Sequence, residues 1–307
     1  MRVLDTIGRT RLMPLQHMVP EGSARILVKL EYENPTGSMK DRMALAMVEA
    51  AEADGRLRPG GSVVEYTGGS TGVSLAFVCA AKRIPLQIVT SEAFSKEKRD
   101  HMMALGAHLT LVASPTGGTT KALTLEMIET ARRLASASGS YWTDQLNNTD
   151  QLSSYERMGE EIWEQTNGQV SAFVQSVGTS GSLRGISTRL RVHKQAVRVV
   201  AVEPEESAVL SGRPSGTHKI EGTGVGFVVP LWTATLADEV QTVSTQEAMA
   251  TARRLARLEG IFAGTSTGGN VAVALRVAER LGPDHTVVTV AVDSGMKYLS
   301  TALYAQP

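Results

Sequence analysis

The sequence contains only one cysteine, Cys79, in 307 residues, which excludes an intramolecular disulfide and any CxxC metal or redox motif. Cys79 lies in the apolar stretch 76–81, so we expect a buried structural thiol and not a nucleophile. The six histidines are scattered, without an HExxH motif or another ligand spacing. We therefore predict no metal site.

Neither sign of charge is in excess, because 31 basic residues balance 31 acidic ones. This balance does not favour binding to nucleic acid or to an anionic membrane, and a small molecule is the expected partner. No apolar run is long enough to span a bilayer, and Asp5, Arg9 and Arg11 interrupt the start of the chain, which argues against a signal peptide. We expect a cytoplasmic protein.

Short apolar runs alternate with longer helical patterns along the chain. Most of the short runs are apolar at nearly every position, as in strands that are buried on both faces of a parallel sheet. The alternation predicts a layered α/β protein, with a soft boundary between two α/β blocks near residues 144–149. The strands are expected at 26–30, 62–66, 86–90, 109–112, 172–177, 197–203 and 286–292, and helices at 41–53, 73–82, 95–105, 120–135, 155–166, 245–259 and 270–281.

Three loops rich in Gly, Ser and Thr precede predicted helices, at 67–72, 178–182 and 264–269. Free backbone N–H groups at a helix N-terminus bind phosphates and carboxylates, and glycine lets a ligand approach closely. Any one such loop is more often an ordinary turn or helix cap, and none matches a P-loop or a clean GxGxxG. Together they predict a site for a compact ligand with more than one anionic group.

Other conspicuous residues predict structural roles. The charged run 96–100 is typical of a solvated helix face. Trp142, Trp163 and Trp232 are expected in cores or interfaces. The long irregular segment 211–223 is a candidate wall of an active site, because long loops in compact domains tend to be functional.

The segment Asn34-Pro35-Thr36-Gly37-Ser38-Met39-Lys40-Asp41-Arg42 follows the first predicted strand and begins a helix. On its own, Lys40 would be interpreted as a solvated lysine. The segment resembles the pyridoxal-phosphate (PLP) lysine motif of the cysteine synthase and cystathionine β-synthase family. Nearly the whole chain shares the resemblance, through similar motifs in the same order at 7–10, 178–182, 203–204, 207–212, 218–222, 226–227, 293–295 and 298–301.

The resemblance implies fold type II of the PLP-dependent enzymes, which is tryptophan synthase β-like. In this fold two layered α/β domains hold the cofactor in the cleft between them, and members of the family usually assemble as homodimers, which we therefore expect here. We expect a smaller, mobile domain at 41–146 that carries the substrate loop. Residues 1–40 and 147–307 would form the larger, PLP-binding domain.

The resemblance also implies roles for individual residues. Lys40 would carry the cofactor as a Schiff base and move the α-proton of the substrate. Ser266 would face the pyridine nitrogen, and Ser70 would lie near the 3′-oxygen. The cofactor phosphate would be held by Gly178, Thr179, Ser180, Gly181 and Ser182. The substrate carboxylate would be held by Thr67, Gly68, Gly69, Thr71 and Gln145.

Several positions depart from the family pattern, among them Arg11 in place of a proline, the shorter segment 145–150 and three positions expected at the site. Gly68 replaces a serine, Ser70 replaces an asparagine, and Glu221 replaces a glutamine that is common near the cofactor. A hydrogen bond to a charged group contributes about 1.5–3 kcal/mol, which is enough to change substrate preference.

The resemblance predicts β-replacement, in which O-acetylserine and sulfide give L-cysteine and acetate through an aminoacrylate intermediate. One alternative is a β-eliminating lyase such as a cysteine desulfhydrase, and another is a cystathionine β-synthase-like enzyme. A catalytically silent regulatory homologue is a third.

Overall fold

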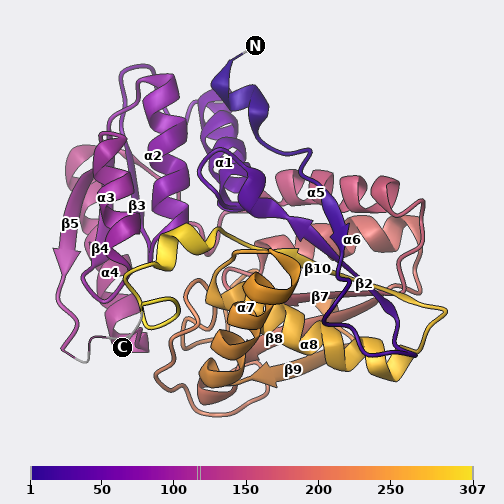
Figure 1. Cartoon of the computed structure of the whole chain (residues 1–307). Coiled ribbons are helices and arrows are strands. Elements are labelled where there is room, and N and C mark those ends of the chain that lie inside the picture. The colour runs from indigo at the N-terminus through magenta and orange to yellow at the C-terminus, as the bar shows by residue number, and fades with distance from the viewer. Residues whose placement is uncertain (1, 116, 118, 306–307) are drawn as a thin grey trace.

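The computed structural model describes residues 2–115, 117 and 119–305. Its strands form a six-stranded sheet in the order β1-β2-β10-β7-β8-β9 and a four-stranded sheet in the order β5-β4-β3-β6. Figure 1 shows the smaller sheet with α2, α3 and α4 on one side of the molecule, and the larger sheet with α5 to α8 on the other. The predicted α/β class is confirmed.

The six-stranded sheet is parallel except for β1, which pairs antiparallel with β2. All positions of β7 and β10 are buried, as expected for strands covered on both faces. The strands are β1 (Leu12–Pro14), β2 (Arg25–Leu30), β7 (Ala172–Ser176), β8 (Arg198–Pro204), β9 (Glu239–Val243) and β10 (Thr286–Ala291). The helices are α5 (Gln151–Gln165), α6 (Gly181–His193), α7 (Thr245–Glu259) and α8 (Thr265–Leu281).

The four-stranded sheet is parallel throughout. Its strands are β3 (Val63–Tyr66), β4 (Leu86–Ser91), β5 (His108–Val112) and β6 (Tyr141–Trp142). The nearby helices are α1 (Lys40–Asp54), α2 (Ser70–Lys82), α3 (Lys96–Ala104) and α4 (Lys121–Ser138). These strands lie inside the range 41–146 expected for a smaller domain, whose bounds stay a prediction. The 3-10 helices are η1 (Val3–Thr6), η2 (Glu31–Glu33), η3 (Glu205–Ser207), η4 (Ala234–Leu236) and η5 (Gly295–Tyr298).

The seven predicted strands are confirmed to within one residue at each end, whereas several helices begin earlier than predicted. For example, α8 begins at Thr265 and not at Asn270, because the Gly/Ser/Thr loop already forms its first turn. Strands β1, β6 and β9 were not predicted. They are short or half-exposed, so they lack a continuous apolar run.

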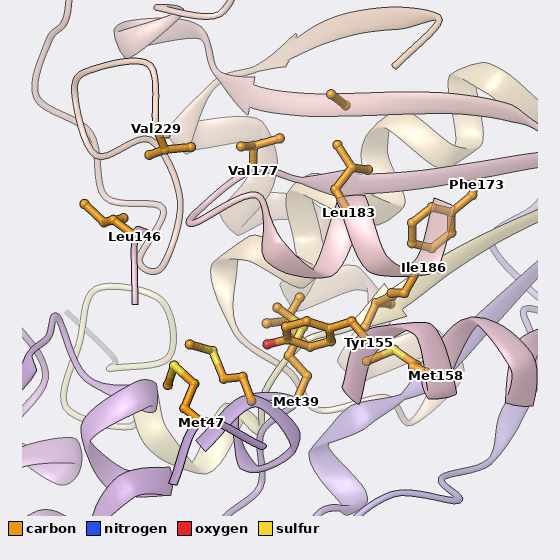
Figure 2. Close-up of a cluster of buried hydrophobic side chains, with 14 of the residues drawn as sticks. Met39, Met47, Leu146, Tyr155, Met158, Phe173, Val177, Leu183, Ile186 and Val229 are labelled. Carbon is orange, nitrogen blue, oxygen red and sulfur yellow. The ribbon is translucent and has the colours of Figure 1, made fainter. Parts of the chain in front are cut away.

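A hydrophobic core lies beside the start of α1 and fixes the position of the residue before Lys40. Met39 is buried in this core, and Figure 2 shows it among the same group of side chains as Tyr155 and Met158. Burial of a side chain of this size contributes about 1.5–3 kcal/mol. Met39 therefore anchors the first turn of α1. Within the described residues, no helix combines the length and apolarity needed to cross a membrane.

Candidate active site

A cavity of about 810 Å³, counting the part open to solvent, lies between the two sheets. Thr67, Gly178 and Asp293 follow the carboxyl ends of β3, β7 and β10 and all line it. This is the expected ligand position in open α/β sheets. The predicted site residues that line the cavity are Lys40, Thr67, Gly68, Gly69, Ser70, Thr71, Gln145, Gly178, Thr179 and Ser266. Ser180, Gly181 and Ser182 are not in this lining and continue the Gly178 loop into α6.

Lys40 is the first residue of α1, and its side chain lines the cavity. Its Nζ makes no hydrogen bond to the described residues, so the amine is available to a ligand. Burial lowers the pKa of Lys40 to about 8, and the charge of Asp293 offsets only part of this effect. The neutral form of the amine therefore makes up about a tenth of the molecules at pH 7, far more than for an ordinary lysine.

Lys297 is the second amine with a strongly lowered pKa. Burial lowers the pKa of Lys297 to about 8, and its Nζ has no hydrogen-bond partner among the described residues. It lines a separate groove on the protein surface and not the cavity. Lys40 and Lys297 have similarly lowered pKa values, so the position of Lys40 in the cavity, and not its pKa, identifies it as the amine of the site.

The loop 178–182 has room for backbone but not for side chains at two positions. A Cβ on Gly178 would lie 2.3 Å from the carbonyl oxygen of Gly222, and one on Gly181 would lie 2.1 Å from Oε1 of Gln151. Ser180 has a left-handed conformation (φ 71°), and its buried hydroxyl has no partner among the described residues. The loop thus brings the N-terminus of α6 and an unpaired hydroxyl together, which suits an anionic group.

The loop 67–71 forms the N-terminus of α2 on the facing side. The Gly69 N–H donates to Oγ1 of Thr67 (2.9 Å), which folds the loop back on itself. The Thr71 hydroxyl donates to Oε1 of Gln145 (2.8 Å), and Nε2 of Gln145 donates to the carbonyl of Tyr66 (2.7 Å). The amide of Gln145 is therefore used to hold the loop in place.

Asp293 connects the loop 67–71 to the C-terminal segment. Its Oδ2 accepts hydrogen bonds from Oγ of Ser70 (2.8 Å) and from the hydroxyl of Tyr298 (2.9 Å). Its Oδ1 is buried without a partner among the described residues. Since Ser70 donates its proton to Asp293, only its lone pairs remain for another group.

Ser266 lies in the first turn of α8 and lines the cavity. Among the described residues its hydroxyl has no hydrogen-bond partner, although the residue is 2% exposed. It is thus a buried hydroxyl that is available to a ligand.

The prediction of a solvated face at residues 96–100 is wrong for Lys98, which is buried. Lys98 lines the cavity and pairs with Glu221. Phe94 lines the cavity as well. No sequence signal marked either residue, because their contacts are with segments distant in the chain.

The structure also tests the expectation for Cys79. Cys79 is buried in α2, and burial raises the pKa of its thiol to about 12, which confirms a structural thiol. A search of the described residues for His, Cys, Asp and Glu finds no group of three placed to hold a metal ion.

Comparisons with known proteins identify relatives along the whole chain. The family model described as pyridoxal-phosphate dependent enzyme matches residues 3–293. A cysteine synthase of Staphylococcus aureus is 39% identical over 305 residues, which cover 99% of this chain and 96% of the relative.

Solved structures of related enzymes have the same fold. The O-ureido-L-serine synthase superposes with a TM-score of 0.91 at 38% identity, covering 99% of this chain and 94% of the other. Cysteine synthase from Entamoeba histolytica superposes with a TM-score of 0.92 at 35% identity, covering 100% and 91%. These matches and the cavity around Lys40 show that the chain belongs to the family of pyridoxal-phosphate-dependent enzymes.

Proposed function

We propose that the protein catalyses β-replacement on an O-activated L-serine, converting O-acetylserine and sulfide into L-cysteine and acetate. The observation that carries this proposal is the position of Lys40, whose unpaired amine lines a cavity between two helix N-termini. One N-terminus suits a cofactor phosphate and the other a substrate carboxylate. The relative from S. aureus, named a cysteine synthase, supports the same reaction.

The residues around the cavity fit pyridoxal phosphate. Ser180 offers a buried hydroxyl without a partner among the described residues, and Gly178 and Thr179 of the same loop line the cavity. With Ser182 they would hold the phosphate, and Ser266 would meet the ring nitrogen with a neutral hydroxyl. When bound, the cofactor supplies an electron sink that makes the α-proton of an amino acid removable.

Lys40 would hold the cofactor and then move the α-proton. An amine can accept a proton only when it is neutral, and the lowered pKa of about 8 makes the neutral form of Lys40 far more accessible near pH 7 than that of an ordinary lysine. The same amine, once charged, can return a proton to the product. One group can thus act as base and acid in the two halves of the reaction.

The loop 67–71 would hold the carboxylate of the amino acid. Among the described residues, the backbone N–H groups of Ser70 and Thr71 have no partner and can donate to it, and the positive end of α2 favours a negative charge there. Gln145 would fix Thr71 through its amide oxygen, and of the two N–H groups of its amide, one donates to the carbonyl of Tyr66 and the other would serve the substrate. Movement of the smaller domain over the bound substrate would exclude water from the site.

The contact between Ser70 and Asp293 favours a second candidate, a β-eliminating lyase such as a cysteine desulfhydrase. An asparagine amide at position 70 could donate a hydrogen bond to the cofactor, whereas Ser70 donates to Asp293. This difference would remove a hydrogen bond to the bound cofactor and so alter the electron sink that the cofactor supplies to the substrate. Accumulation of pyruvate and ammonia without an added nucleophile would identify the lyase.

The test follows the visible spectrum of the purified holoenzyme while O-acetylserine and then sulfide are added. Replacement predicts a new absorption band with O-acetylserine, and its loss on addition of sulfide as L-cysteine forms. A spectrum that O-acetylserine leaves unchanged would contradict the proposal. Cysteine, O-phosphoserine and homocysteine are then the substrates to test.

We also propose that the protein is a homodimer that works in the cytoplasm. The family resemblance supports the dimer, and light scattering of the purified holoenzyme tests it. A monomeric mass at micromolar concentration would contradict it.

A further inference from the structure

The first turn of α3 carries a charged side chain that is shielded from water. Lys96 and Asp100 of the same helix pair with each other and are 70% and 50% exposed, whereas the Lys98 side chain is 3% exposed. An ammonium group that loses its water shell is strongly destabilised unless it is paired. The partners of Lys98 therefore indicate why a lysine occupies this position.

These partners belong to the part of the chain around the six-stranded sheet. The Nζ of Lys98 lies 2.6 Å from Oε2 of Glu221 and 4.1 Å from the centre of the Tyr298 ring. Glu221 lies in the connection between β8 and β9, and Tyr298 ends η5. Lys98 itself extends from a helix that packs beside the four-stranded sheet. One ammonium group thus connects the two α/β units beside the cavity.

A neighbouring residue makes a second connection. The carboxylate of Glu97 accepts hydrogen bonds from the backbone N–H (2.6 Å) and the hydroxyl (2.8 Å) of Ser300. This contact is exposed to solvent and is therefore weak. The buried pair of Lys98 and Glu221 is the stronger of the two connections between α3 and the larger sheet.

The methylene stem of Lys98 packs directly on the loop 67–71. A Cβ on Gly69 would lie 2.2 Å from Cδ of Lys98, and Gly69 has a φ of 146°, which strongly favours glycine. Gly69 lies in the middle of the loop. Any displacement of the Lys98 side chain would therefore change the support of this backbone.

We propose that the Lys98–Glu221 ion pair positions the loop 67–71 and so determines how tightly the protein binds the carboxylate of its amino-acid substrate. The inference rests on the proposed function, in which this loop holds that carboxylate. Glu221 holds the ammonium group of Lys98, the stem of Lys98 supports Gly69, and Gly69 orients the backbone donors of the loop. Both are positioning residues, and Lys40 keeps its part in the reaction.

This arrangement predicts a specific pattern of effects. Each single substitution removes one charge of the same ion pair, so Lys98→Met and Glu221→Gln should weaken substrate binding by similar factors. The double variant should bind the substrate at least as tightly as the single variant with the lower affinity, because the double variant leaves no unpaired buried charge. The KM should rise while kcat stays close to that of the wild type, because ground-state positioning is lost and not the chemistry.

The test compares holoenzymes of the wild type, Lys98→Met, Glu221→Gln and the double variant. Met keeps an unbranched apolar stem on Gly69 and removes the charge. The dissociation constant of L-alanine, which has no β-leaving group, is measured from the change in visible absorbance of the bound cofactor. We expect an increase of about tenfold for each single variant, and a matching increase in the KM for O-acetylserine with kcat within about twofold.

Two further variants separate positioning from a general structural role. Lys96→Met removes an exposed charge from the same turn of α3 and should leave the L-alanine affinity unchanged. Lys98→Arg keeps a positive charge and should recover most of the affinity lost in Lys98→Met. Cofactor content and melting temperature are recorded for every variant.

Two outcomes would overturn the inference. Either Lys98→Met and Glu221→Gln bind L-alanine as tightly as the wild type, or their losses lie only in cofactor content and melting temperature. A wild-type holoenzyme that responds to neither L-alanine nor O-acetylserine would contradict the proposed function itself. A wild type that does respond, with variants that bind L-alanine equally tightly, would instead contradict only the inference about the ion pair.

Discussion

A side chain at position 68 would collide with Phe94. A Cβ on Gly68 would lie 2.8 Å from Cε1 and 3.1 Å from Cζ of the Phe94 ring. Phe94 is buried and lines the cavity beside this glycine. The aromatic ring thus occupies the space that the serine of the family pattern would need. Gly68 of the loop 67–71 and Phe94, which lies between β4 and α3, therefore form one packing unit.

We therefore predict that Gly68→Ser weakens binding of O-acetylserine, although serine is the residue of the family pattern at this position. Overpacking of a rigid ring contact costs about 1–3 kcal/mol, and the loop has to shift to relieve it. In a Phe94→Ala background, Gly68→Ser should raise the KM and lower the melting temperature by less than it does in the wild type. The KM and melting temperature of the four proteins of this cycle measure the effect. Equal changes in KM and melting temperature in both backgrounds would contradict a collision between the serine and the Phe94 ring.

Asp293 is predicted to keep the pKa of Lys40 from falling below about 8. Burial lowers this pKa, and the negative charge of Asp293 raises it. In Asp293→Asn the raising charge is gone, so the pKa of Lys40 should fall and its amine should be neutral at a lower pH. The measurement is the pH profile of the rate at which the apoprotein takes up pyridoxal phosphate. Its midpoint should move down in Asp293→Asn.

Ser70→Ala is the control variant for Asp293→Asn. It removes a hydrogen bond to Asp293 and leaves the carboxylate in place. The midpoint should then stay close to that of the wild type. A midpoint that rises or does not move in Asp293→Asn would contradict the electrostatic account.

Arg42 is predicted to be a main source of stability behind the site. Its guanidinium donates to both oxygens of Glu31 (2.8 Å each) and both oxygens of Glu161 (2.7 Å each). Removing one partner of a buried ion pair costs about 3–5 kcal/mol, because the other charges stay buried without it. Arg42→Met should lower the free energy of unfolding of the apoprotein by this amount in urea.

The exposed pair of Arg132 and Glu129 is the matched control for Arg42. Arg132→Met should change the free energy of unfolding by about 0–1 kcal/mol. Similar losses in the two variants would show that burial of the Arg42 network is unimportant.

Glu65 should make stability fall with rising pH. Burial raises the pKa of Glu65 to about 8, although hydrogen bonds from Thr143 and Gln145 partly oppose this. The folded protein therefore keeps a proton that the unfolded chain releases above about pH 4.5. Stability is thus lost as the pH rises from about 4.5 to 8, and Glu65→Gln should flatten this dependence. Urea unfolding at several pH values measures it, and an unchanged slope in the variant would exclude the role of Glu65.

The strands could be predicted because burial on both faces leaves a continuous apolar run, as at 172–177 and 286–292. The helix starts were predicted less well, because Ser70 and Thr265 are small polar residues that belong equally to loops and to first helical turns. The loops 67–72 and 178–182 were expected after the carboxyl ends of strands, and residues of both line the cavity, although β3 and β7 belong to different sheets.

The side-chain contacts that position the residues around the cavity could not be predicted from the sequence. Lys98 and Glu221 are 123 positions apart, and only the folded chain brings them together. A run of charges on a short helix indicates a solvated face because local patterns contain no information about a distant partner. Asp293 and Tyr298 belonged to motifs of the family resemblance, but the hydrogen bonds to Asp293 follow only from the structure.

The central claim is that Lys40 carries pyridoxal phosphate. Reduction of the holoenzyme with borohydride would fix the cofactor covalently to its lysine, and peptide mapping by mass spectrometry would then identify that residue. We predict a modified peptide that contains Lys40, and no such peptide from Lys40→Ala. Modification of Lys98 or Lys297, the other buried lysines near the site, or of no lysine at all, would contradict the claim.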